Sequence, residues 1–222
     1  MSAGVLGILG GTFDPIHYGH IRLGIEAMDA LGLDGVRIIP AGVPPHRAPP
    51  AAPAQARLAM VRLAAAAEPR FVVDASEAAS PLPGYTVDTL TRLRSELGRE
   101  RPLCLLLGAD AFAGLPTWSR WLQLFELAHI AVASHAKRPL DIDALPPALA
   151  EQYFARRAES AAALRAAPAG CVQSFAMSAI DVSASTIRRE IARGQRPRDL
   201  LPDAVLDYID ANHLYRKELD GR

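Results

Sequence analysis

The sequence has few cysteines and no excess charge of either sign. Its 222 residues include only two cysteines, Cys104 and Cys171, too few for a disulfide framework or a four-cysteine zinc site. We therefore expect both to be small apolar side chains in a reducing compartment. The 24 Lys and Arg residues balance 24 Asp and Glu residues. This balance argues against a broad basic surface that binds nucleic acid, but it leaves room for a small anion site.

Long hydrophobic runs are also missing. No uninterrupted apolar stretch approaches the ~20 residues of a membrane-spanning helix. Residues 1–11 lack the charged leader and apolar stretch of a signal peptide. We therefore expect a cytoplasmic protein without a membrane partner. The apolar fraction of 50% excludes a disordered chain, and the length is sufficient for one large domain with its own core.

Short apolar runs alternate with longer segments of helical periodicity. The predicted strands are 5–9, 36–40, 71–74, 103–107, 130–134 and 172–175. The predicted helices are 19–31, 54–67, 86–97 with Thr86 at its N-cap, 148–167, 183–194 and 202–212. The runs 103–107 and 130–134 are almost continuously apolar, as in strands covered on both faces. This alternation predicts an α/β fold with a doubly wound, mostly parallel sheet, in a single domain over residues 1–222.

The segment 10–20, with the sequence GGTFDPIHYGH, directly follows the first predicted strand. Glycines at a strand's end let a ligand approach the backbone, as the carboxyl edge of a doubly wound sheet requires. The glycine spacing fits neither the dinucleotide fingerprint nor the Walker loop. His17 and His20 share one face at the start of the next helix, near the positive end of its dipole. Two such donors suit an anion, above all a phosphate.

These two histidines alone are also compatible with a helix cap or with half of a metal site. No third His, Cys or carboxylate lies nearby at familiar ligand spacing, so we expect no protein-bound metal. A second segment, 183–188, combines hydroxyls at a helix start with the forked guanidinium of Arg188, which also suits phosphate. Its alternative is an ordinary serine N-cap followed by a solvated arginine.

The first segment resembles the HxGH signature of the nucleotidyltransferase superfamily, and its full form is similar to that of the bacterial nicotinate-nucleotide adenylyltransferases. The second segment, VSASTIR at 182–188, resembles the superfamily's ISSTxxR motif, with Val for Ile, Ala for the middle Ser and Ser for Thr. The resemblance implies a Rossmann-like nucleotidyltransferase fold. It covers nearly the whole chain from Gly7 to residues 214–216, except for a less family-like helical segment at about 135–171.

Four further segments resemble the same family: PPHR at 44–47, GYT at 84–86, GAD at 108–110 and PTW at 116–118. The resemblance implies that nicotinate mononucleotide is bound by these residues: Arg47, Thr86, Gly108, Asp110 and Trp118. Each segment has a structural alternative, namely a proline-rich surface loop, a helix cap or a core tryptophan. For the core tryptophan, Trp121 is the better candidate.

One segment departs from the family pattern. After the fifth strand the family continues with Arg-Pro-Gly or a near variant, which contributes a cation near ATP. This chain has SHAKRP at 134–139, so the cations are shifted. The role therefore stays open among His135, Lys137 and Arg138.

The resemblance implies transfer of AMP from ATP to nicotinate mononucleotide, giving nicotinate adenine dinucleotide and pyrophosphate in NAD biosynthesis. We expect catalysis by His17, His20 and Arg188. ATP would be bound by the following residues: Gly10, Gly11, Thr12, Phe13, Ser183, Ser185 and Arg188. Mg²⁺ is expected to arrive with ATP and to be held mainly by phosphates and water. The sequence is compatible with a monomer or a homo-oligomer, and it leaves open the preference between nicotinate and nicotinamide mononucleotide.

Three alternatives differ in substrate or class. A pantetheine-phosphate adenylyltransferase ordinarily carries Thr at the first histidine position and has a shorter chain, and His17, Thr86 and Trp118 speak against it. A nucleotide-sensing module without turnover would tolerate the loss of His17, His20 or Arg188, yet all three are present. RNA binding by an arginine-rich surface is disfavoured by the neutral balance and by the lack of an aromatic-basic motif.

Overall fold

The computed structural model describes residues 4–43, 49–135 and 139–216. Within these ranges the chain forms one six-stranded sheet in the order β3-β2-β1-β4-β5-β6, and every pair of neighbouring strands is parallel. The strands are β1 (Leu6–Gly11), β2 (Gly35–Pro40), β3 (Phe71–Val73), β4 (Leu103–Gly108), β5 (His129–Ser134) and β6 (Val172–Ala176). The predicted doubly wound parallel sheet is confirmed, and the strand order is that of a Rossmann fold.

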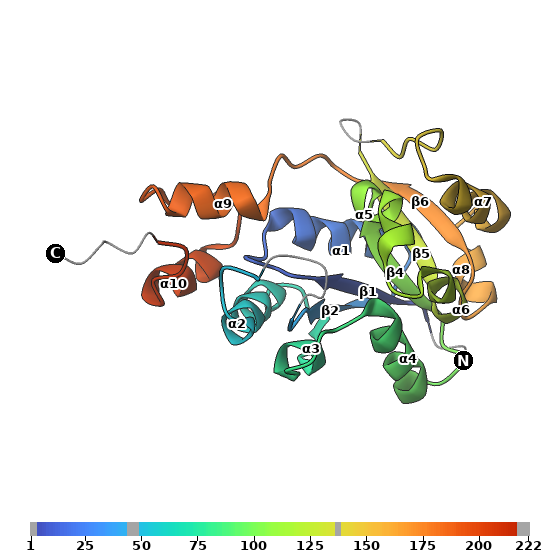
Figure 1. Cartoon of the computed structure of the whole chain (residues 1–222), viewed down its shortest axis with the longest axis horizontal. Helices are drawn as coiled ribbons and strands as arrows, with labels where there is room; N and C mark the ends of the chain where they lie inside the picture. Colours follow the sequence, from blue (N-terminus) through green and yellow to red (C-terminus); the bar gives the residue numbers. More distant parts are fainter. Residues whose placement is uncertain (1–3, 44–48, 136–138, 217–222) are drawn as a thin grey trace.

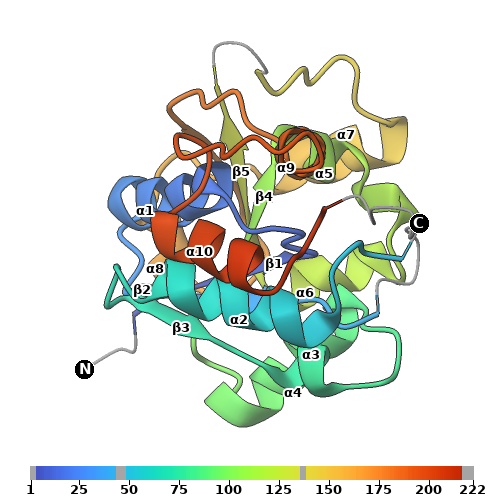
Figure 2. The same ribbon diagram turned by 90° about the vertical axis from the view of Figure 1, so that its left-hand side faces the viewer.

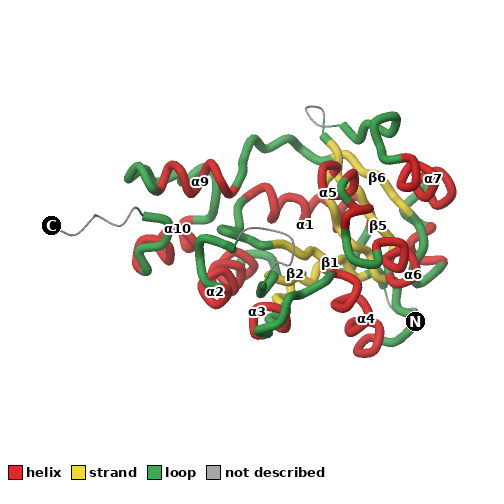
Figure 3. Tube along the Cα trace, viewed as in Figure 1, coloured by secondary structure: helices red, strands yellow, loops and turns green. Residues whose placement is uncertain are grey.

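Helices connect the strands and lie on both sides of the sheet (Figures 1 and 3). Those before β4 are α1 (Tyr18–Leu31), α2 (Ala54–Ala65), α3 (Ser76–Ala79) and α4 (Thr86–Leu97). After β4 come α5 (Ala109–Ala113), the 3-10 turns η1 (Leu115–Thr117) and η2 (Trp121–Gln123), α6 (Leu124–Leu127), α7 (Pro147–Arg156), α8 (Ala163–Ala166), α9 (Ala184–Ile191) and α10 (Asp203–Ala211). Figure 2 shows α10 packed beside α2. No helix in the described part of the chain is both long and apolar enough to cross a bilayer.

The sheet has a hydrophobic core on each face. Cys104 and Leu106 of β4 belong to a core that also contains side chains of α1, α2, α9 and α10. Leu105 and Leu107, which alternate with them, belong to a core that contains side chains of α4, α5, α6 and α7. Because successive side chains of a strand point to opposite faces, a strand covered on both faces must be apolar throughout. The continuous apolar character of β4 and β5 therefore has the predicted origin.

The prediction of a single helix over 148–167 is wrong. The chain leaves α7 at Arg157, whose backbone has φ −58° and ψ 128°. Arg157 forms a parallel bridge with Val172 of β6, and the N–H of Ala158 donates to the Val172 carbonyl at 2.8 Å. The alanines of this segment favour a helix. Pairing with β6 instead satisfies the backbone hydrogen-bonding groups of residues 157 and 158, and helix propensity does not reflect such a tertiary partner. The short α8 follows this break.

Other differences concern the ends of elements and short helices. Tyr85 is the N-cap of α4, so the prediction that Thr86 caps this helix is wrong and Thr86 is its first helical residue. The first helix begins at Tyr18, with His17 as its N-cap. The first strand runs on to Gly11. The helices α3, α5 and α6 were not predicted, because segments of four or five residues are too short to show a periodicity.

The two cysteines are free thiols, as expected. Cys104 is buried and Cys171 is half-buried. Burial raises the pKa of Cys104 to about 12 and also raises that of Cys171. Since the thiolate is the reactive form, a raised pKa makes each cysteine a poor nucleophile.

His129 is a fully buried polar residue at the start of β5. Its Nε2 lies 2.9 Å from the carbonyl oxygen of Ala167, and its Nδ1 accepts the N–H of Cys171 at 3.1 Å. These partners assign the proton of the neutral ring to Nε2. Burial lowers the pKa of His129, although the bond to Ala167 acts in the opposite direction. The neutral ring thus ties β5 to the segment that enters β6.

We predict that His129 makes the fold sensitive to acid. As the pH falls below the ordinary histidine pKa of 6.5, the unfolded chain binds the proton first. Stability is therefore complete above that value and decreases below it, by at most ~1.4 kcal/mol per pH unit for one histidine. Urea denaturation at about pH 7.5 and about pH 5.5 measures this loss. The His129→Gln variant should lose less free energy of unfolding between the two pH values than the wild type, and an equal loss would contradict the assignment.

Candidate active site

Strands β1 and β4 separate at their carboxyl ends. The paired residues are Leu6–Ile8 and Leu103–Leu105, whereas the strands themselves continue to Gly11 and Gly108. The strand order changes direction between β1 and β4. In open α/β sheets such a switch point leaves a crevice in which ligands bind. The candidate site therefore lies where the glycine-rich segment leaves β1.

Glycines keep this crevice open. A Cβ atom added to Gly10 or to Gly108 would meet no described atom within 4 Å. A Cβ atom on Gly11 would lie 2.9 Å from the ring of Phe13, so a larger residue does not fit there. Phe13 adopts a left-handed φ of 49° and is only 2% exposed. Its ring belongs to the core.

His17 and His20 are neighbours, as their spacing predicts. Their ring centroids are 3.7 Å apart in a stacked arrangement, and the ring of Phe13 meets His20 edge-on at 4.9 Å. The backbone N–H of His17 donates to Nδ1 of His20 at 3.3 Å. A neutral His20 therefore carries its proton on Nε2. This leaves the Nε2–H of His20 as a hydrogen-bond donor.

Both histidines have pKa values below the ordinary histidine value. Burial lowers the pKa of His17 to about 4. Burial, together with the neighbouring His17, lowers the pKa of His20 well below its ordinary value. Nδ1 of His17 is buried and has no hydrogen-bond partner among the described residues. An anion beside the two rings would raise both pKa values, because a negative charge stabilises the protonated form.

The start of α9 adds further residues to the candidate site. The Oγ of Ser183 accepts the N–H of Thr186 at 3.2 Å and lies 3.0 Å from the Oγ of Ser185. Ser183 is thus the N-cap of α9, as its structural alternative proposed. One turn later, Nη1 of Arg188 donates to the carbonyl oxygen of Asp14 at 2.6 Å. The two segments that carry the sequence signal are therefore in contact, although they are far apart along the chain.

Asp14 is a functional candidate that the sequence reasoning missed. Its side chain is buried, and its carboxylate accepts the N–H groups of Ala51 and Ala52 at 2.7 and 3.0 Å. It also accepts the hydroxyl of Tyr215 at 2.8 Å. The position of Asp14 inside the glycine-rich segment was the sequence signal that could have identified it. For Tyr215 the sequence offered only its position near the end of the chain.

Arg57 is a second missed residue, and it is only 1% exposed. Its guanidinium donates to the carbonyl oxygens of Thr12 and Ala41 at 2.6 Å, Gly42 at 2.8 Å and Ala52 at 3.2 Å. Burial lowers the pKa of Arg57, and the carboxylate of Asp14 opposes this effect. Since arginine stays protonated in proteins, Arg57 places a positive charge beneath the glycine-rich loop. The many other arginines of the chain concealed it in the sequence.

The starts of α4 and α5 and the turn after η1 carry three other predicted residues. Thr86 opens α4, Asp110 is exposed in the first turn of α5, and Trp118 is half-buried after η1. An ion pair between Asp88 and Arg120 holds the segment after Trp118 beside the first turn of α4. The structure thus brings the predicted Thr86 and Trp118 segments together. Trp121, expected in the core, is only half-buried, although it packs against the core beneath α4 to α7.

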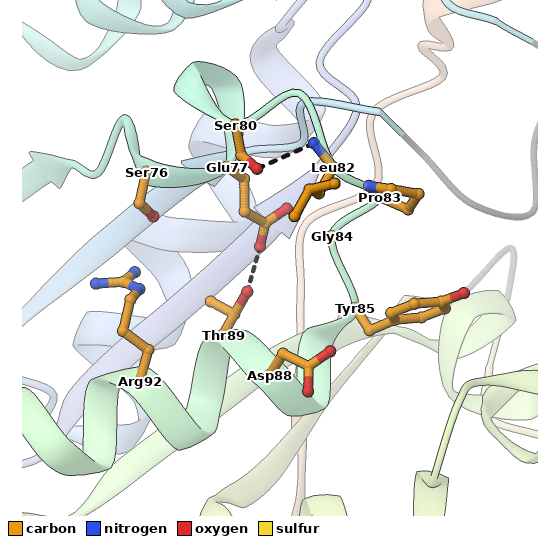
Figure 4. Close-up of a pocket in the computed structure, with 10 residues that line it drawn as sticks. All are labelled: Ser76, Glu77, Ser80, Leu82, Pro83, Gly84, Tyr85, Asp88, Thr89 and Arg92. Atoms are coloured by element: carbon orange, nitrogen blue, oxygen red, sulfur yellow. Dashed lines mark hydrogen bonds between the residues drawn. The ribbon is translucent and has the colours of Figure 1, made fainter.

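A shallow cavity of about 190 Å³ lies between α3 and the start of α4 (Figure 4). The hydroxyl of Thr89 donates to Glu77 at 2.5 Å across it. Burial raises the pKa of Glu77, although the bond from Thr89 opposes this effect. Figure 4 shows that the ring of Tyr85 points away from Glu77. The wall of this cavity contains Glu77 and Asp88, and its one cation, Arg92, is paired with Asp74. These carboxylates disfavour a phosphate, so the crevice between β1 and β4 is the better site.

Three of the predicted cations, Arg47, Lys137 and Arg138, lie outside the described residues. His135 is described and is half-buried just after β5. Over 4–43, 49–135 and 139–216, no group of three or more His, Cys, Asp or Glu side chains could hold a metal ion. The described site thus consists of hydrogen-bond donors around an open crevice.

Comparisons with known proteins show the family and the fold of this chain. Residues 8–190 match the family model described as cytidylyltransferase-like. A protein of Dechloromonas aromatica (strain RCB) named "probable nicotinate-nucleotide adenylyltransferase" is 53% identical over 211 residues, which are 95% of this chain and 97% of that protein. A protein of the same name from Laribacter hongkongensis (strain HLHK9) is 48% identical, over 96% and 95% of the two chains. The solved structure of Plasmodium falciparum nicotinic acid mononucleotide adenylyltransferase with NaAD is similar in fold, with a TM-score of 0.69, 15% identity and coverage of 96% and 97%.

We predict that both site histidines are uncharged at about pH 6 in the absence of ligand, because burial lowers both pKa values. NMR spectra of ¹⁵N-labelled protein should show His20 as the Nε2–H tautomer and should place the titration of His17 near pH 4. Spectra of His17→Asn and His20→Asn variants would assign the signals. A charged ring at about pH 6, or the Nδ1–H tautomer at His20, would show that the described hydrogen bonding is wrong.

Proposed function

Since this chain belongs to the cytidylyltransferase-like family and, within it, to the nicotinate-nucleotide adenylyltransferases, we propose that the crevice between β1 and β4 transfers AMP from ATP to nicotinate mononucleotide. The products are nicotinate adenine dinucleotide and pyrophosphate, in NAD biosynthesis. The observation that carries this proposal is the contact between the GGTFDPIHYGH segment and the start of α9 through Asp14 and Arg188. Together these segments surround the crevice with donors suited to phosphate.

The chemistry asks for positioning and for stabilisation of charge. The phosphate of the mononucleotide attacks the α-phosphorus of ATP in line, and the bond to the pyrophosphate leaving group breaks. Negative charge grows on the phosphate oxygens in the transition state. No protein nucleophile is needed for this transfer, which accords with the raised pKa values of both thiols.

We assign binding of the ATP phosphates to His17, His20 and Arg188. His20 donates from Nε2, His17 lies against it, and Arg188 contacts the β- and γ-phosphates. The backbone from Gly10 to Phe13 lines the path of the nucleotide, and the hydroxyls of Ser183 and Ser185 lie at the start of α9. Both histidines bind as neutral donors and gain proton affinity as the phosphate charge grows, so the stabilisation increases toward the transition state.

We assign binding of nicotinate mononucleotide to the residues at the starts of α4 and α5 and after η1. The N-cap of α4 makes no side-chain capping bond, so the first N–H groups and the Thr86 hydroxyl are suited to the ring carboxylate. Trp118 stacks on the pyridine ring, while Gly108 and Asp110 contact the sugar. Arg47 lies outside the described residues. The resemblance alone assigns it to the phosphate of the mononucleotide. The charged carboxylate gains more from this helix end than a neutral amide, so we propose a preference for nicotinate over nicotinamide mononucleotide.

The metal in this proposal is Mg²⁺ bound with ATP. The carboxylate of Asp14 already accepts three hydrogen bonds, and no metal-binding cluster exists in the described part of the chain. These residues fit an ion that is held by phosphate oxygens and water. Such an ion neutralises phosphate charge, while the protein's own donors orient the reacting groups.

The remaining predictions concern the whole protein. We propose that residues 1–222 form one nucleotidyltransferase domain. The C-terminal helices α9 and α10 belong to the same hydrophobic core as the single six-stranded sheet. The helical segment at about 135–171 belongs to it through α7 and α8. A cytoplasmic location and the absence of nucleic-acid partners stay predictions, and the chain is compatible with a monomer or a homo-oligomer.

The proposed activity has a direct test. Purified protein with ATP, Mg²⁺ and nicotinate mononucleotide should release pyrophosphate and form nicotinate adenine dinucleotide, and it should do so faster than with nicotinamide mononucleotide. Tight ATP binding without product would instead support the nucleotide-sensing alternative. Turnover with pantetheine phosphate in place of the pyridine nucleotides would support the sibling enzyme.

We predict that His20→Ala lowers kcat by about 10²–10³-fold, the usual effect of removing one donor from a transition state. The exposed His213 lies outside the site and provides a matched control. The His213→Asn variant keeps a residue that tolerates the left-handed φ of 52° at that position, and it should retain wild-type turnover. Full activity of His20→Ala would remove His20 from the mechanism.

We predict that Gly10→Ala weakens ATP binding by about tenfold or more without a loss of stability. The added methyl group meets no described atom within 4 Å, so the variant should fold normally and its unfolding free energy should stay within about 0.5 kcal/mol of the wild type. The same methyl group points into the space assigned to the nucleotide. Calorimetric titration with ATP and thermal denaturation measure the two effects, and unchanged ATP affinity would place the nucleotide elsewhere.

A further inference from the structure

Asp14 holds Arg188 at two points. The backbone carbonyl of Asp14 accepts a hydrogen bond from Nη1 of Arg188 at 2.6 Å. The carboxylate oxygen Oδ2 of the same residue lies 3.7 Å from the same Nη1. The side chain of Arg188 is one-third exposed, whereas that of Asp14 is 7% exposed. One edge of the guanidinium is therefore fixed to a buried group, and the rest of it is available to a ligand.

Three donors from two other parts of the chain hold the Asp14 carboxylate. Oδ2 accepts the N–H of Ala51, and Oδ1 accepts the N–H of Ala52. Oδ1 also accepts the hydroxyl of Tyr215, which is distant in sequence and follows α10. A buried carboxylate with donors on both oxygens cannot rotate without losing these bonds. Its orientation is thus fixed before any ligand binds.

An arginine that binds phosphate needs a defined orientation, because its planar fork recognises oxygen atoms only in matching geometry. A long side chain at a surface otherwise samples many rotamers. The contacts of Asp14 restrict this freedom on the side of Arg188 that faces away from solvent. Arg188 can therefore present its remaining N–H groups to the crevice without further ordering.

Resting on the function proposed above, we propose that Asp14 is a positioning residue for Arg188, and that Tyr215 locks Asp14 in the orientation that this task requires. Asp14 does not touch the substrate. It acts through the guanidinium, so the value of its carboxylate for catalysis depends on the presence of Arg188. The segment after α10 thereby contributes to the site through one hydroxyl group.

The test is a double-mutant cycle with Asp14→Asn and Arg188→Gln. Asp14→Asn keeps the backbone carbonyl that binds Arg188 but removes the negative charge. We expect it to lower kcat/KM for ATP by about fivefold or more in the wild type, within the range for coupled neighbours, and by less than about twofold when Arg188 is already Gln. Equal factors in the two backgrounds would indicate a merely structural role and overturn the proposal.

A second cycle covers the case in which Asp14→Asn fails to fold. Tyr215→Phe removes one hydroxyl and leaves the carboxylate and both backbone bonds in place. It should lower kcat/KM for ATP in the wild type and have little further effect beside Arg188→Gln. Tyr208→Phe on α10 is the matched control, since its hydroxyl makes no hydrogen bond within the described residues, and it should be neutral. A Tyr215→Phe variant with wild-type kinetics, or one with an equal loss in both backgrounds, would overturn the role of Tyr215.

The outcomes separate this inference from the proposed function. If the wild-type protein forms no nicotinate adenine dinucleotide, the proposed function fails, and calorimetric affinities for ATP replace kcat/KM in both cycles. Coupling in those affinities would still support the positioning of Arg188 by Asp14. If the wild type is active and the cycles are additive, the inference alone is wrong. Thermal denaturation of every variant ensures that only folded protein is compared.

Discussion

Two opposite charges are buried beneath the glycine-rich loop, and the loops around the crevice depend on them. Asp14 takes its hydrogen bonds from residues 51, 52 and 215, and Arg57 gives its own to residues 12, 41, 42 and 52. A buried charge that lacks such partners costs several kcal/mol. The connections after β1 and β2 and the segment after α10 must therefore adopt the one arrangement that supplies them, and this arrangement borders the crevice.

The same burial sets the electrostatics of the site. His17 and His20 stack in a desolvated position, which lowers the pKa of both rings and keeps them neutral. Arg57 remains charged below the loop, and Arg188 reaches the crevice from α9. The chain has no net charge, so under the proposed function its affinity for polyanionic substrates comes from this local group. A neutral imidazole that gains a proton more readily beside phosphate responds most strongly when the phosphate charge is greatest.

Much of the fold could be predicted because its signals are local. The continuous apolar runs of β4 and β5 indicated strands covered on both faces, and the glycines at the end of β1 predicted the close approach of a ligand. The break at Arg157 could not be predicted, since the alanine-rich sequence favours a helix and the competing partner, Val172, belongs to another element. Asp14, Arg57 and Tyr215 were missed for a similar reason: their importance lies in burial and in partners far along the chain.

The sequence by itself determined the alternation of strands with the longer helices and the doubly wound parallel sheet, and it named the histidine and arginine donors of the proposed site. These features follow from periodicity and from residue types at short spacing, which are properties of the chain alone. Only the tertiary structure decided the separation of β1 from β4, the tautomer of His20 and the attachment of Arg188 to Asp14. Each of these depends on hydrogen bonds, pairing or burial between segments that meet only when the sheet has formed. Local pattern carries no information about such partners.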